Sequence, residues 1–340
     1  MRTAVILFNL GGPDGPDAVR PFLQNLFSDP AIITLPWILR TPIARLIAKR
    51  RAPVAQEIYG HIGGRSPIVP QTQAQARALE AALGMQGLEA KAFIAMRYWH
   101  PFSDGAAMAV KAYAPDRIVL LPLYPQFSTT TTESSVRDWQ RAARKAGLNV
   151  PTAEICCYPR QAGFVAAMAS RIRDALGDAP PAEFRLLLSA HGLPKKIIRS
   201  GDPYQWQVEQ SAAAIVDALG IPDLDWQVCY QSRVGPLEWI GPSTDDEIRR
   251  AGADGRKVIV APLAFVSEHS ETLVELDIEY ARLARESGVA DYRRAGTVTD
   301  HPDFIAGLAG LVRDAVLDGA RSPRLCPTSL ARCGCAGEKA

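Results

Sequence analysis

Short apolar runs alternate with amphipathic segments along nearly the whole chain, and this alternation constrains the fold more than any other feature. Strands are predicted at 4–10, 89–97, 116–123, 152–157, 184–190, 225–231, 257–266 and, with a weaker pattern, 291–298. Between them, helices are predicted at 71–84, 136–147, 161–177, 204–219, 271–287 and 303–317. This order is typical of βαβ units and a parallel sheet. Solid apolar strands such as 118–121 indicate a sheet that is covered on both faces.

The two halves of the chain contain similar strand ends, which indicates an internal duplication. Residues 7–13 parallel 188–194, residues 96–101 parallel 230–236, and residues 121–130 parallel 261–269. In each case an apolar strand ends in polar residues with Gly or Pro. A chain of 340 residues has room for about two domains. We therefore expect two similar α/β lobes whose strand ends face one cleft, with the lobe boundary near 150–180.

Charge and hydropathy exclude several classes of protein. The net charge of +2 argues against a nucleic-acid binder that depends on phosphate contacts. A spanning helix needs about 18 consecutive apolar residues, and the sequence contains no such run. The apolar start of the chain is brief and is interpreted as a first strand rather than an export signal. We therefore expect a cytoplasmic protein whose cysteines are reduced.

Histidine and carboxylate side chains follow two of the predicted strands. His191 ends the strand at 184–190, and Glu268 with His269 follows the apolar run that begins at Val258. Ligands of open α/β sheets bind outside the carboxyl ends of the strands, where imidazole can accept protons or bind a metal ion. A lone histidine there is also a common structural residue, so the residues alone leave both interpretations open.

Three glutamates are spaced four residues apart in the helix predicted after this segment: Glu271, Glu275 and Glu279. On an α-helix they would share one face. The face could be solvated, or it could handle protons or metal at the cleft. Oxygen and imidazole ligands without thiolate suit a divalent ion in transit, such as Fe(II).

Three of the six cysteines lie close to the end of the chain: Cys326, Cys333 and Cys335. Zinc and iron–sulfur sites use four ligands. The fourth would come from elsewhere, and Cys156 and Cys157 stand at the end of a predicted strand. The alternative is a disordered tail.

Residues 28–67 form an insertion that has no counterpart in the second half. The insertion is apolar, punctuated by proline, and carries Lys49, Arg50 and Arg51. It could be a lid over a flat apolar ligand with carboxylates, a surface that touches a membrane, or a helical hairpin packed on its own lobe.

Taken together, several short motifs make the chain resemble the ferrochelatase family over about residues 1–320. The resemblance lies in residues 10–13, 48–51, 62–67, 96–98, 124–127, 189–194, 231–233, 241–242 and 265–272. It implies two Rossmann-like lobes with parallel four-stranded sheets, a chelatase-like fold, and a porphyrin cleft between them. The implied domains are 1–150 with the apolar lip insertion 28–67, 151–320 with the metal and proton site, and a Cys-bearing tail at 321–340. Within the insertion, segment 30–51 matches the family's mobile lip.

The resemblance also implies an activity and its residues. The activity is insertion of Fe(II) into protoporphyrin IX to form protohaem, the last step of haem biosynthesis. His191 and Glu271 match the family's catalytic pair, and with Glu268, Glu275 and Glu279 they would handle Fe(II) in transit. Residues that match the lining of the porphyrin pocket are Leu10, Arg51, Arg97, Tyr98, Tyr124, Trp239, Phe265 and His269.

The cysteine tail resembles that of ferrochelatases with a 2Fe–2S cluster. The animal form takes one ligand from the segment matching 128–129, and this chain has no cysteine there. The bacterial variant implies Cys157, or else Cys156, as the fourth ligand beside Cys326, Cys333 and Cys335. Relatives of this kind imply a homodimer and peripheral contact with the inner membrane through the lip.

Two alternative functions remain open at this stage. One is a chelatase for another metal or tetrapyrrole, such as cobalt or coproporphyrin. The other is a tetrapyrrole carrier that is not an enzyme. The three glutamates favour the enzyme, because a carrier has no need of them.

Overall fold

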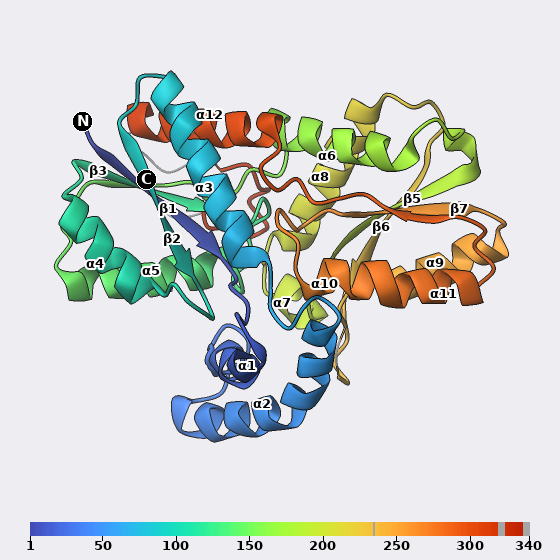
Figure 1. The fold of residues 1–340 in the computed structure, drawn as a ribbon, viewed down its shortest axis with the longest axis horizontal. Coiled ribbons are helices and arrows are strands. Elements are labelled where there is room, and N and C mark those ends of the chain that lie inside the picture. Colours follow the sequence, from blue (N-terminus) through green and yellow to red (C-terminus); the bar gives the residue numbers. More distant parts are fainter. Residues whose placement is uncertain (234, 319–323, 336–340) are drawn as a thin grey trace. The chain divides into compact units, whose positions relative to one another are not determined.

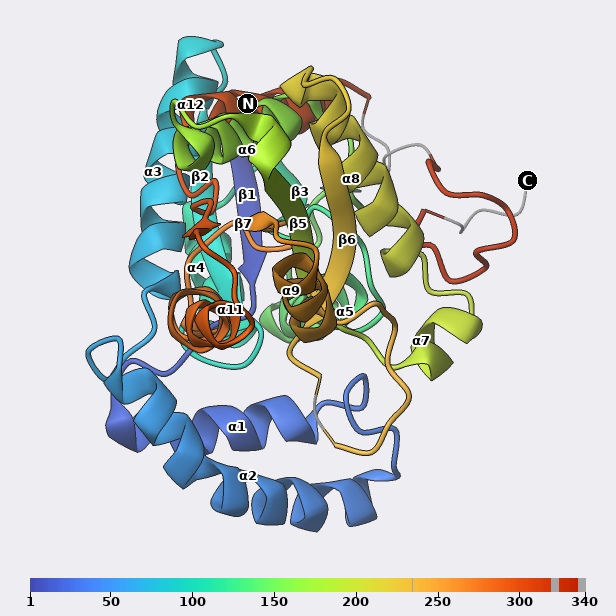
Figure 2. The same ribbon diagram turned by 90° about the vertical axis from the view of Figure 1, so that its right-hand side faces the viewer.

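The computed structural model of the chain describes residues 1–233, 235–318 and 324–335. The chain divides into two compact units (Figures 1 and 2). Unit 1 consists of Met1–Cys157 with Leu308–Pro323, and unit 2 consists of Tyr158–Gly307 with Arg324–Ala340. Helix α12 (Pro302–Asp318) therefore begins in unit 2 and ends in unit 1. The sequence had placed 308–320 with the second lobe.

Unit 1 contains a parallel four-stranded sheet in the order β2-β1-β3-β4. Its strands are β1 (Thr3–Asn9), β2 (Ala90–Met96), β3 (Arg117–Pro122) and β4 (Thr152–Glu154). Helices α4 (Ser103–Tyr113) and α5 (Thr132–Ala146) cover one face through a cluster that includes Phe8, Leu120 and Trp139. Helix α3 (Ile68–Met85) packs against β2. All seven residues of β1 are buried, as expected of a central strand.

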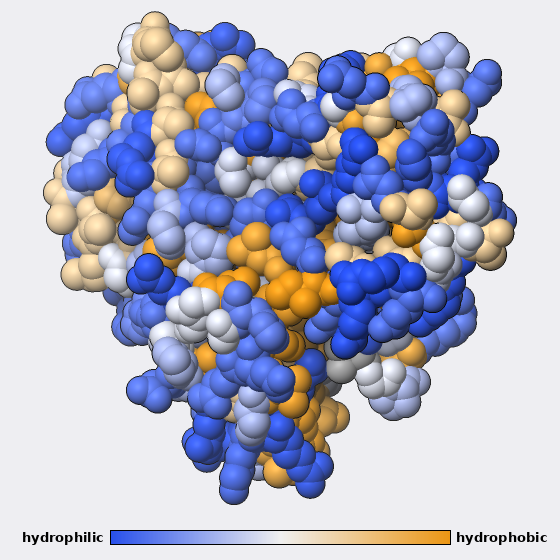
Figure 3. Space-filling view, turned by 45° about the vertical axis from the view of Figure 1, so that its right-hand side comes forward, coloured by the Kyte–Doolittle hydropathy of each residue, from blue (hydrophilic) through white to orange (hydrophobic). Residues whose placement is uncertain are grey.

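The lip insertion is helical. Helices α1 (Val19–Ser28), which follows the short η1 (Pro16–Ala18), and α2 (Trp37–Gly60) lie side by side beyond the carboxyl end of β1 (Figure 1). Only four α2 residues are buried: Ala44, Ala48, Ala52 and Tyr59. The other side of α2 exposes large hydrophobic side chains, at Trp37, Ile38, Leu39, Ile43, Leu46 and Val54. Hydrophobic surface also shows at the lower end of Figure 3, where α1 and α2 lie.

Unit 2 repeats the sheet with the order β6-β5-β7-β8, again entirely parallel. Its strands are β5 (Phe184–His191), β6 (Asp225–Gln231), β7 (Lys257–Pro262) and β8 (Tyr292–Arg294). Its helices are α6 (Ala162–Leu176), η2 (Pro181–Glu183), α7 (Lys195–Arg199), α8 (Tyr204–Leu219), α9 (Thr244–Ala253), α10 (Ser270–Leu273), η3 (Glu275–Tyr280) and α11 (Ala281–Glu286). The buried side chains of α9, η3 and α11 pack together against β7.

Equivalent backbone hydrogen bonds in the two units confirm that the scaffold is repeated. Met96 N–H donates to the Pro101 carbonyl at 2.8 Å, and Tyr230 N–H donates to the Pro242 carbonyl at 2.9 Å. The proline that corresponds to Pro101 is therefore Pro242. The sequence comparison, which paired 96–101 with 230–236, was wrong at that end because unit 2 has a longer loop there.

All eight predicted strands are present, and the predicted α/β class with two parallel four-stranded sheets is confirmed. The strand predicted at 257–266 ends earlier, at Pro262. Helices α1, α4, α7 and α9 were not predicted from the sequence. Within the part of the chain that the structure describes, no helix is both long enough and apolar enough to cross a bilayer.

Candidate functional site

His191 and Glu271 meet at the carboxyl end of the sheet in unit 2. His191 is the last residue of the central strand β5, and Glu271 lies in α10, which follows β7. The His191 Nδ1 atom lies 2.8 Å from Glu271 Oε2, and the side chains are 37% and 30% exposed, respectively. The predicted convergence of two strand ends is therefore present inside one unit, and the pair is partly exposed to solvent.

A second carboxylate, Glu275, stands behind Glu271. The Ser232 hydroxyl lies 2.6 Å from Glu275 Oε2 and 3.3 Å from Glu271 Oε2, so it links the two glutamates. Ser232 N–H donates to Glu275 Oε1 at 2.8 Å, and the Gln231 amide donates to Glu275 Oε2 at 3.1 Å. Gln231 ends strand β6 and Ser232 follows it directly. The polar group thus draws on the ends of three neighbouring strands.

The pKa values of these groups shift in opposite directions. Burial opposes charge on His191, but the carboxylates of Glu271 and Glu275 outweigh it and raise the pKa of the imidazole. Burial also opposes charge on Glu271, but His191, His269 and the Ser232 hydroxyl outweigh it and lower the pKa of Glu271 to about 2. Burial and then the charge of Glu271 raise the pKa of Glu275. The group therefore holds an ionised carboxylate beside a basic imidazole, with a second carboxyl that accepts a proton more readily than usual.

The helix that carries the glutamates is not a regular α-helix. From Glu275 to Tyr280 the chain forms a π-helix, η3, in which Glu279 N–H donates to the Val274 carbonyl five residues earlier. The wider turn places the Tyr280 hydroxyl 3.0 Å from Glu275 Oε1 and leaves Glu279 exposed. The expectation that all three glutamates share one face was therefore wrong for Glu279, because it assumed 3.6 residues per turn.

Glu268 lies in a different environment from the one predicted. Its Oε1 atom accepts hydrogen bonds from Arg294 Nη1 at 2.9 Å and from Thr297 N–H at 3.1 Å. Burial opposes its charge, but Arg294 outweighs burial and lowers the pKa of the carboxyl. Glu268 is therefore an ion-pair partner of Arg294.

Three further predicted residues lie in the loops of unit 2. The ring of Phe265 packs edge-on against the His269 ring, with centroids 4.6 Å apart. His269 is buried, and burial is the main cause of its lowered imidazole pKa. Trp239 lies beside Gly192, where an added Cβ would come within 3.4 Å of its ring. Gly192 therefore lets the loop after His191 approach the indole closely.

In unit 1, two predicted residues surround a buried carboxylate that the sequence did not identify. Asp29 Oδ2 accepts from Arg97 Nη2 at 2.8 Å and from the Tyr98 hydroxyl at 2.8 Å, and the Ser134 hydroxyl also donates to it. Asp29 Oδ1 accepts from Ala31 N–H at 2.8 Å. Tyr98 is only 1% exposed. Arg97 and Tyr98 thus hold the start of the loop between α1 and α2.

The other predicted residues of unit 1 do not belong to the Asp29 cluster. Leu10 packs on the cluster that α1 and α2 form with Tyr98, and Tyr124 packs on the cluster under α4 and α5. The guanidinium of Arg51 is exposed and lies 5.9 Å from the centre of the Phe27 ring. Their contact with a substrate stays a prediction.

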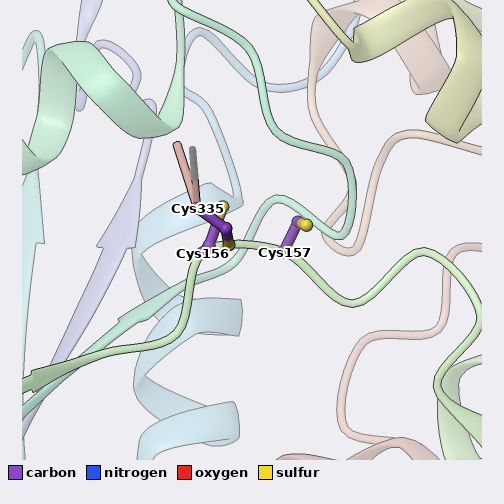
Figure 4. Close-up of side chains that lie close together, drawn as sticks. All are labelled: Cys156, Cys157 and Cys335. Atoms are coloured by element: carbon purple, nitrogen blue, oxygen red, sulfur yellow. The ribbon is translucent and has the colours of Figure 1, made fainter. Parts of the chain in front are cut away.

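The five cysteines of the predicted cluster lie in two stretches of chain. Cys156 and Cys157 follow β4 at the end of unit 1, are both buried, and have Sγ atoms within 4.8 Å of each other (Figure 4). Cys326 and Cys333 are buried in unit 2, and Cys335 in the same unit is partly exposed. The Gln207 amide donates to Cys326 Sγ at 3.0 Å.

Sequence reasoning did not identify Ser232, Tyr280 or Arg294 as members of the site. The Gln231-Ser232 pair could have been found, because it follows a predicted strand in the same way as His191. Tyr280 could not, because its contact with Glu275 depends on the π-helical turn.

Comparison with solved structures identifies the fold. The sirohydrochlorin chelatase SirB from Bacillus subtilis subspecies spizizenii, solved in complex with cobalt, has a TM-score of 0.55 with 13% identity. The match covers 94% of this chain and 97% of that chain. SirB from Bacillus subtilis with Fe3+ gives a TM-score of 0.53 with 15% identity, covering 92% and 95%. At such low identity the likeness shows the fold alone, which is that of the chelatases.

Sequence comparison identifies the particular family. The ferrochelatase family matches residues 2–316. The ferrochelatase of Caulobacter vibrioides is 58% identical over 93% of this chain and 90% of its own length. The ferrochelatases of Phenylobacterium zucineum and Pelagibacter ubique are 56% and 47% identical over 98% of this chain, covering 98% and 99% of their own lengths. The chain belongs to the ferrochelatase family.

Proposed function

We propose that this chain inserts Fe(II) into protoporphyrin IX to form protohaem, the last step of haem biosynthesis. Family membership over almost the whole chain supports the reaction. The single structural observation that carries it is the hydrogen-bonded group of His191, Glu271 and Glu275 at the strand ends of unit 2.

The reaction needs a proton acceptor, and it involves no change in the oxidation state of iron. Iron remains Fe(II), and the two pyrrole N–H groups of the free porphyrin each lose a proton as the four nitrogens bind the metal. Glu271 is ionised, so it accepts a hydrogen bond from Nδ1–H of a neutral His191 and leaves the Nε2 lone pair available. His191 Nε2 is the proton acceptor in this proposal, and Glu271 stabilises the imidazolium that forms.

Glu275 provides the next position for the proton. The Ser232 hydroxyl lies between the two carboxylates, and the raised pKa of Glu275 makes it the better proton acceptor of the two. The proton would then pass from His191 to Glu271 and on to Glu275, with the Ser232 hydroxyl keeping the two carboxylates close together. The exposed Glu279 and the ion-paired Glu268 have no part in this relay.

The same group suits iron as a substrate. Imidazole nitrogen and carboxylate oxygen bind Fe(II) without the thiolates that would retain it tightly. The partial exposure of His191 and Glu271 leaves coordination positions open to the metal. Porphyrin contact is assigned in this proposal to Leu10, Arg51, Tyr124, Trp239, Phe265 and His269, and binding energy would bend the ring so that a nitrogen lone pair faces the metal.

The test is anaerobic metalation of protoporphyrin IX and of coproporphyrin with Fe(II), followed by absorption spectroscopy. We expect protohaem to form at the higher kcat/KM. A higher kcat/KM for coproporphyrin would identify the protein as a chelatase for that tetrapyrrole. If neither porphyrin is metalated, the protein would be a tetrapyrrole carrier and not a chelatase.

A 2Fe–2S cluster is proposed as a second, resident group. The ligands would be Cys326, Cys333 and Cys335 with Cys157 or Cys156. Several observations fit such a group: four of these thiols are buried, and the amide N–H···S contact from Gln207 to Cys326 is of the kind that stabilises a thiolate. When bound, the cluster would supply a one-electron redox centre that the chelation step does not use.

The cluster is tested by analysis of anaerobically purified protein. Two irons and two sulfides per chain, with visible absorption that reduction bleaches, are expected. Cys157→Ser and Cys156→Ser separate the two candidates for the fourth ligand, because only one substitution should lower the iron content. Zinc in place of iron, or no metal after reconstitution, would contradict the proposal.

The exposed side of α2 is proposed as a membrane contact. Hydrophobic side chains at Trp37, Ile38 and Leu39 share the helix with the exposed cations Arg45, Lys49 and Arg50. This combination suits the surface of an anionic bilayer. Flotation with vesicles of anionic phospholipid should recover the chain, and Trp37→Ser with Leu39→Ser should abolish recovery. Equal flotation of that variant would contradict the proposal.

A further inference from the structure

The segment that carries the glutamates is held by side chains from both edges of the sheet in unit 2. The sheet order is β6-β5-β7-β8, so β6 and β8 are its edge strands and His191 ends a central one. Residues 275–277 of η3 contact groups that belong to both edges. The segment is therefore fixed across the strand ends rather than by its own helix.

On the β6 side the contacts go to Glu275. Ser232 N–H, the Ser232 hydroxyl and the Gln231 amide all donate to its carboxylate. The Gln231 amide also donates to the Glu271 carbonyl at 2.9 Å. These contacts already belong to the proposed relay.

On the β8 side the next two residues of η3 are held by Tyr292 and Arg294. The Tyr292 hydroxyl donates to the Leu276 carbonyl at 2.8 Å, and Arg294 Nε donates to the Asp277 carboxylate. The second nitrogen of Arg294, Nη1, reaches Glu268, which lies just before α10. Arg294 is 14% exposed and thus joins both ends of the stretch that contains Glu271 and Glu275. A planar guanidinium offers two separate nitrogens in fixed directions for these contacts, whereas a lysine has a single nitrogen on a flexible stem.

We propose that Arg294 is a positioning residue that holds Glu271 and Glu275 in place against His191, acting through Asp277 and Glu268. It touches neither His191 nor the relay carboxylates. Loss of its guanidinium releases the β8 side of η3, so the two glutamates move relative to His191 while His191 itself stays on its strand. This inference rests on the proposed function, because the displaced groups are those of the proposed relay.

The experiment measures kcat, the KM for Fe(II) and the Kd for protoporphyrin in Arg294→Met, Arg294→Lys and Asp277→Asn. A displacement of about 1 Å at a reacting group costs up to about a hundredfold in rate. We expect kcat to fall about tenfold or more in Arg294→Met with the porphyrin Kd unchanged. Arg294→Lys and Asp277→Asn, each of which keeps part of the linkage, should fall between this variant and the wild type.

A double-mutant cycle decides whether Arg294 acts through Glu271. In a Glu271→Gln background, Arg294→Met should lower kcat less than about twofold further, because residues that act as one unit are not additive. A full tenfold loss in that background would overturn the proposal. If Arg294→Met does not fold, the same cycle with Asp277→Asn gives the decision.

Arg293→Gln is the matched control. Arg293 is the neighbouring residue of β8, pairs with Asp291 and donates to the Leu176 carbonyl at the end of α6. Its loss should lower thermal stability and leave kcat within about twofold of the wild type. An equal fall of kcat in both variants would show that β8 matters only for stability and would overturn the proposal. Failure of the wild type to metalate porphyrin would refute the proposed function instead, so the two failures are distinguishable.

Discussion

The two units have the same sheet and differ in what they do with the ends of its strands. Register and hydrogen bonding make Leu10 of unit 1 equivalent to His191 of unit 2, and Arg97 with Tyr98 equivalent to Gln231 with Ser232. In unit 1 the strand-end polar groups surround the buried carboxylate of Asp29. In unit 2 they surround Glu275 and leave Glu271 and His191 partly exposed.

This difference shows how one scaffold supports two roles. The carboxylate of unit 1 has a guanidinium and two hydroxyls as partners, so its charge is balanced and it fixes the loop between α1 and α2. Neither carboxylate of the unit 2 relay has an arginine partner among the described residues. Their charge is left to act on His191, whose pKa rises in consequence. The Asp29 cluster, with its charge balanced, stabilises the fold of unit 1. The Glu271 and Glu275 carboxylates, with no balancing arginine among the described residues, are suited to proton transfer.

The largest effect should come from His191. Removal of a positioned proton acceptor costs about 10²–10⁴ in rate, so His191→Ala should lower kcat by at least a hundredfold. Porphyrin binding, followed by absorption or fluorescence titration, should persist. His61→Ala, which changes an exposed histidine at the end of α2 in unit 1, is the control and should retain full turnover. Near-normal metalation by His191→Ala would remove His191 from the mechanism.

Asp29→Asn tests the structural role of the cluster in unit 1. The side chain is 2% exposed and pairs with Arg97. Breaking a buried pair costs about 3–5 kcal/mol, and because the amide keeps some hydrogen bonds we expect about 2–4 kcal/mol in urea unfolding. Asp104→Asn is matched to it, since Asp104 also pairs with an arginine but is 42% exposed. Its cost should stay within about 1 kcal/mol. A similar loss of unfolding free energy in both variants would show that the buried Asp29 pair stabilises the fold no more than the exposed Asp104 pair.

The pH dependence of turnover tests the unbalanced charge in unit 2. Neutral His191 is the acceptor, so activity should fall as the pH drops through its raised pKa, which lies above the usual value of 6.5. Glu271→Gln removes the carboxylate that contributes most to raising this pKa and leaves only Glu275 to oppose the effect of burial. The acidic limb of the kcat profile should therefore move to lower pH while the maximum rate falls. An unchanged limb would show that another group titrates.

The same pair links pH to stability, with opposite signs for its two members. The raised pKa of His191 contributes stability that is complete below 6.5 and is lost as the pH rises through the folded-state pKa. The lowered pKa of Glu271 contributes stability above 4.5 that is lost as the pH falls towards about 2. The wild type minus Glu271→Gln difference in unfolding free energy should therefore be greatest between about 4.5 and 6.5. A difference that grows above pH 7 would contradict the pairing.

The smallest effect is expected from Ser232→Ala. The hydroxyl links Glu271 and Glu275, but Ser232 N–H still holds Glu275 after the substitution. Since the other donors remain, loss of the hydroxyl should cost about 1 kcal/mol, which corresponds to a fall in kcat of about three- to tenfold. Thr130→Ala in unit 1, which removes another buried hydroxyl, is the control. Loss comparable with that of His191→Ala would mean that the hydroxyl is an obligatory proton carrier.

The sequence was sufficient for the sheets and insufficient for the details of the site. Apolar runs locate strands reliably, because a strand buried on both faces must be apolar throughout. The position of His191 was predictable, since it ends a strand, whereas the role of Glu271 was implied only by the family resemblance. Asp29 was not, because a lone aspartate after a helix has no pattern that shows burial, and its partners lie far away in the sequence. Glu279 was placed wrongly because a π-turn leaves no mark on a four-residue spacing.

The π-helical turn also determines how many residues lie between Glu275 and Tyr280. The Glu275–Tyr280 contact spans five residues, where an α-helix would need four. Deleting the exposed Ile278 would turn this stretch into an ordinary α-helix and keep Tyr280 over Glu275. The segment thus contains one residue more than its contacts require. A shortened chain that still folds would reveal whether that residue serves stability or turnover.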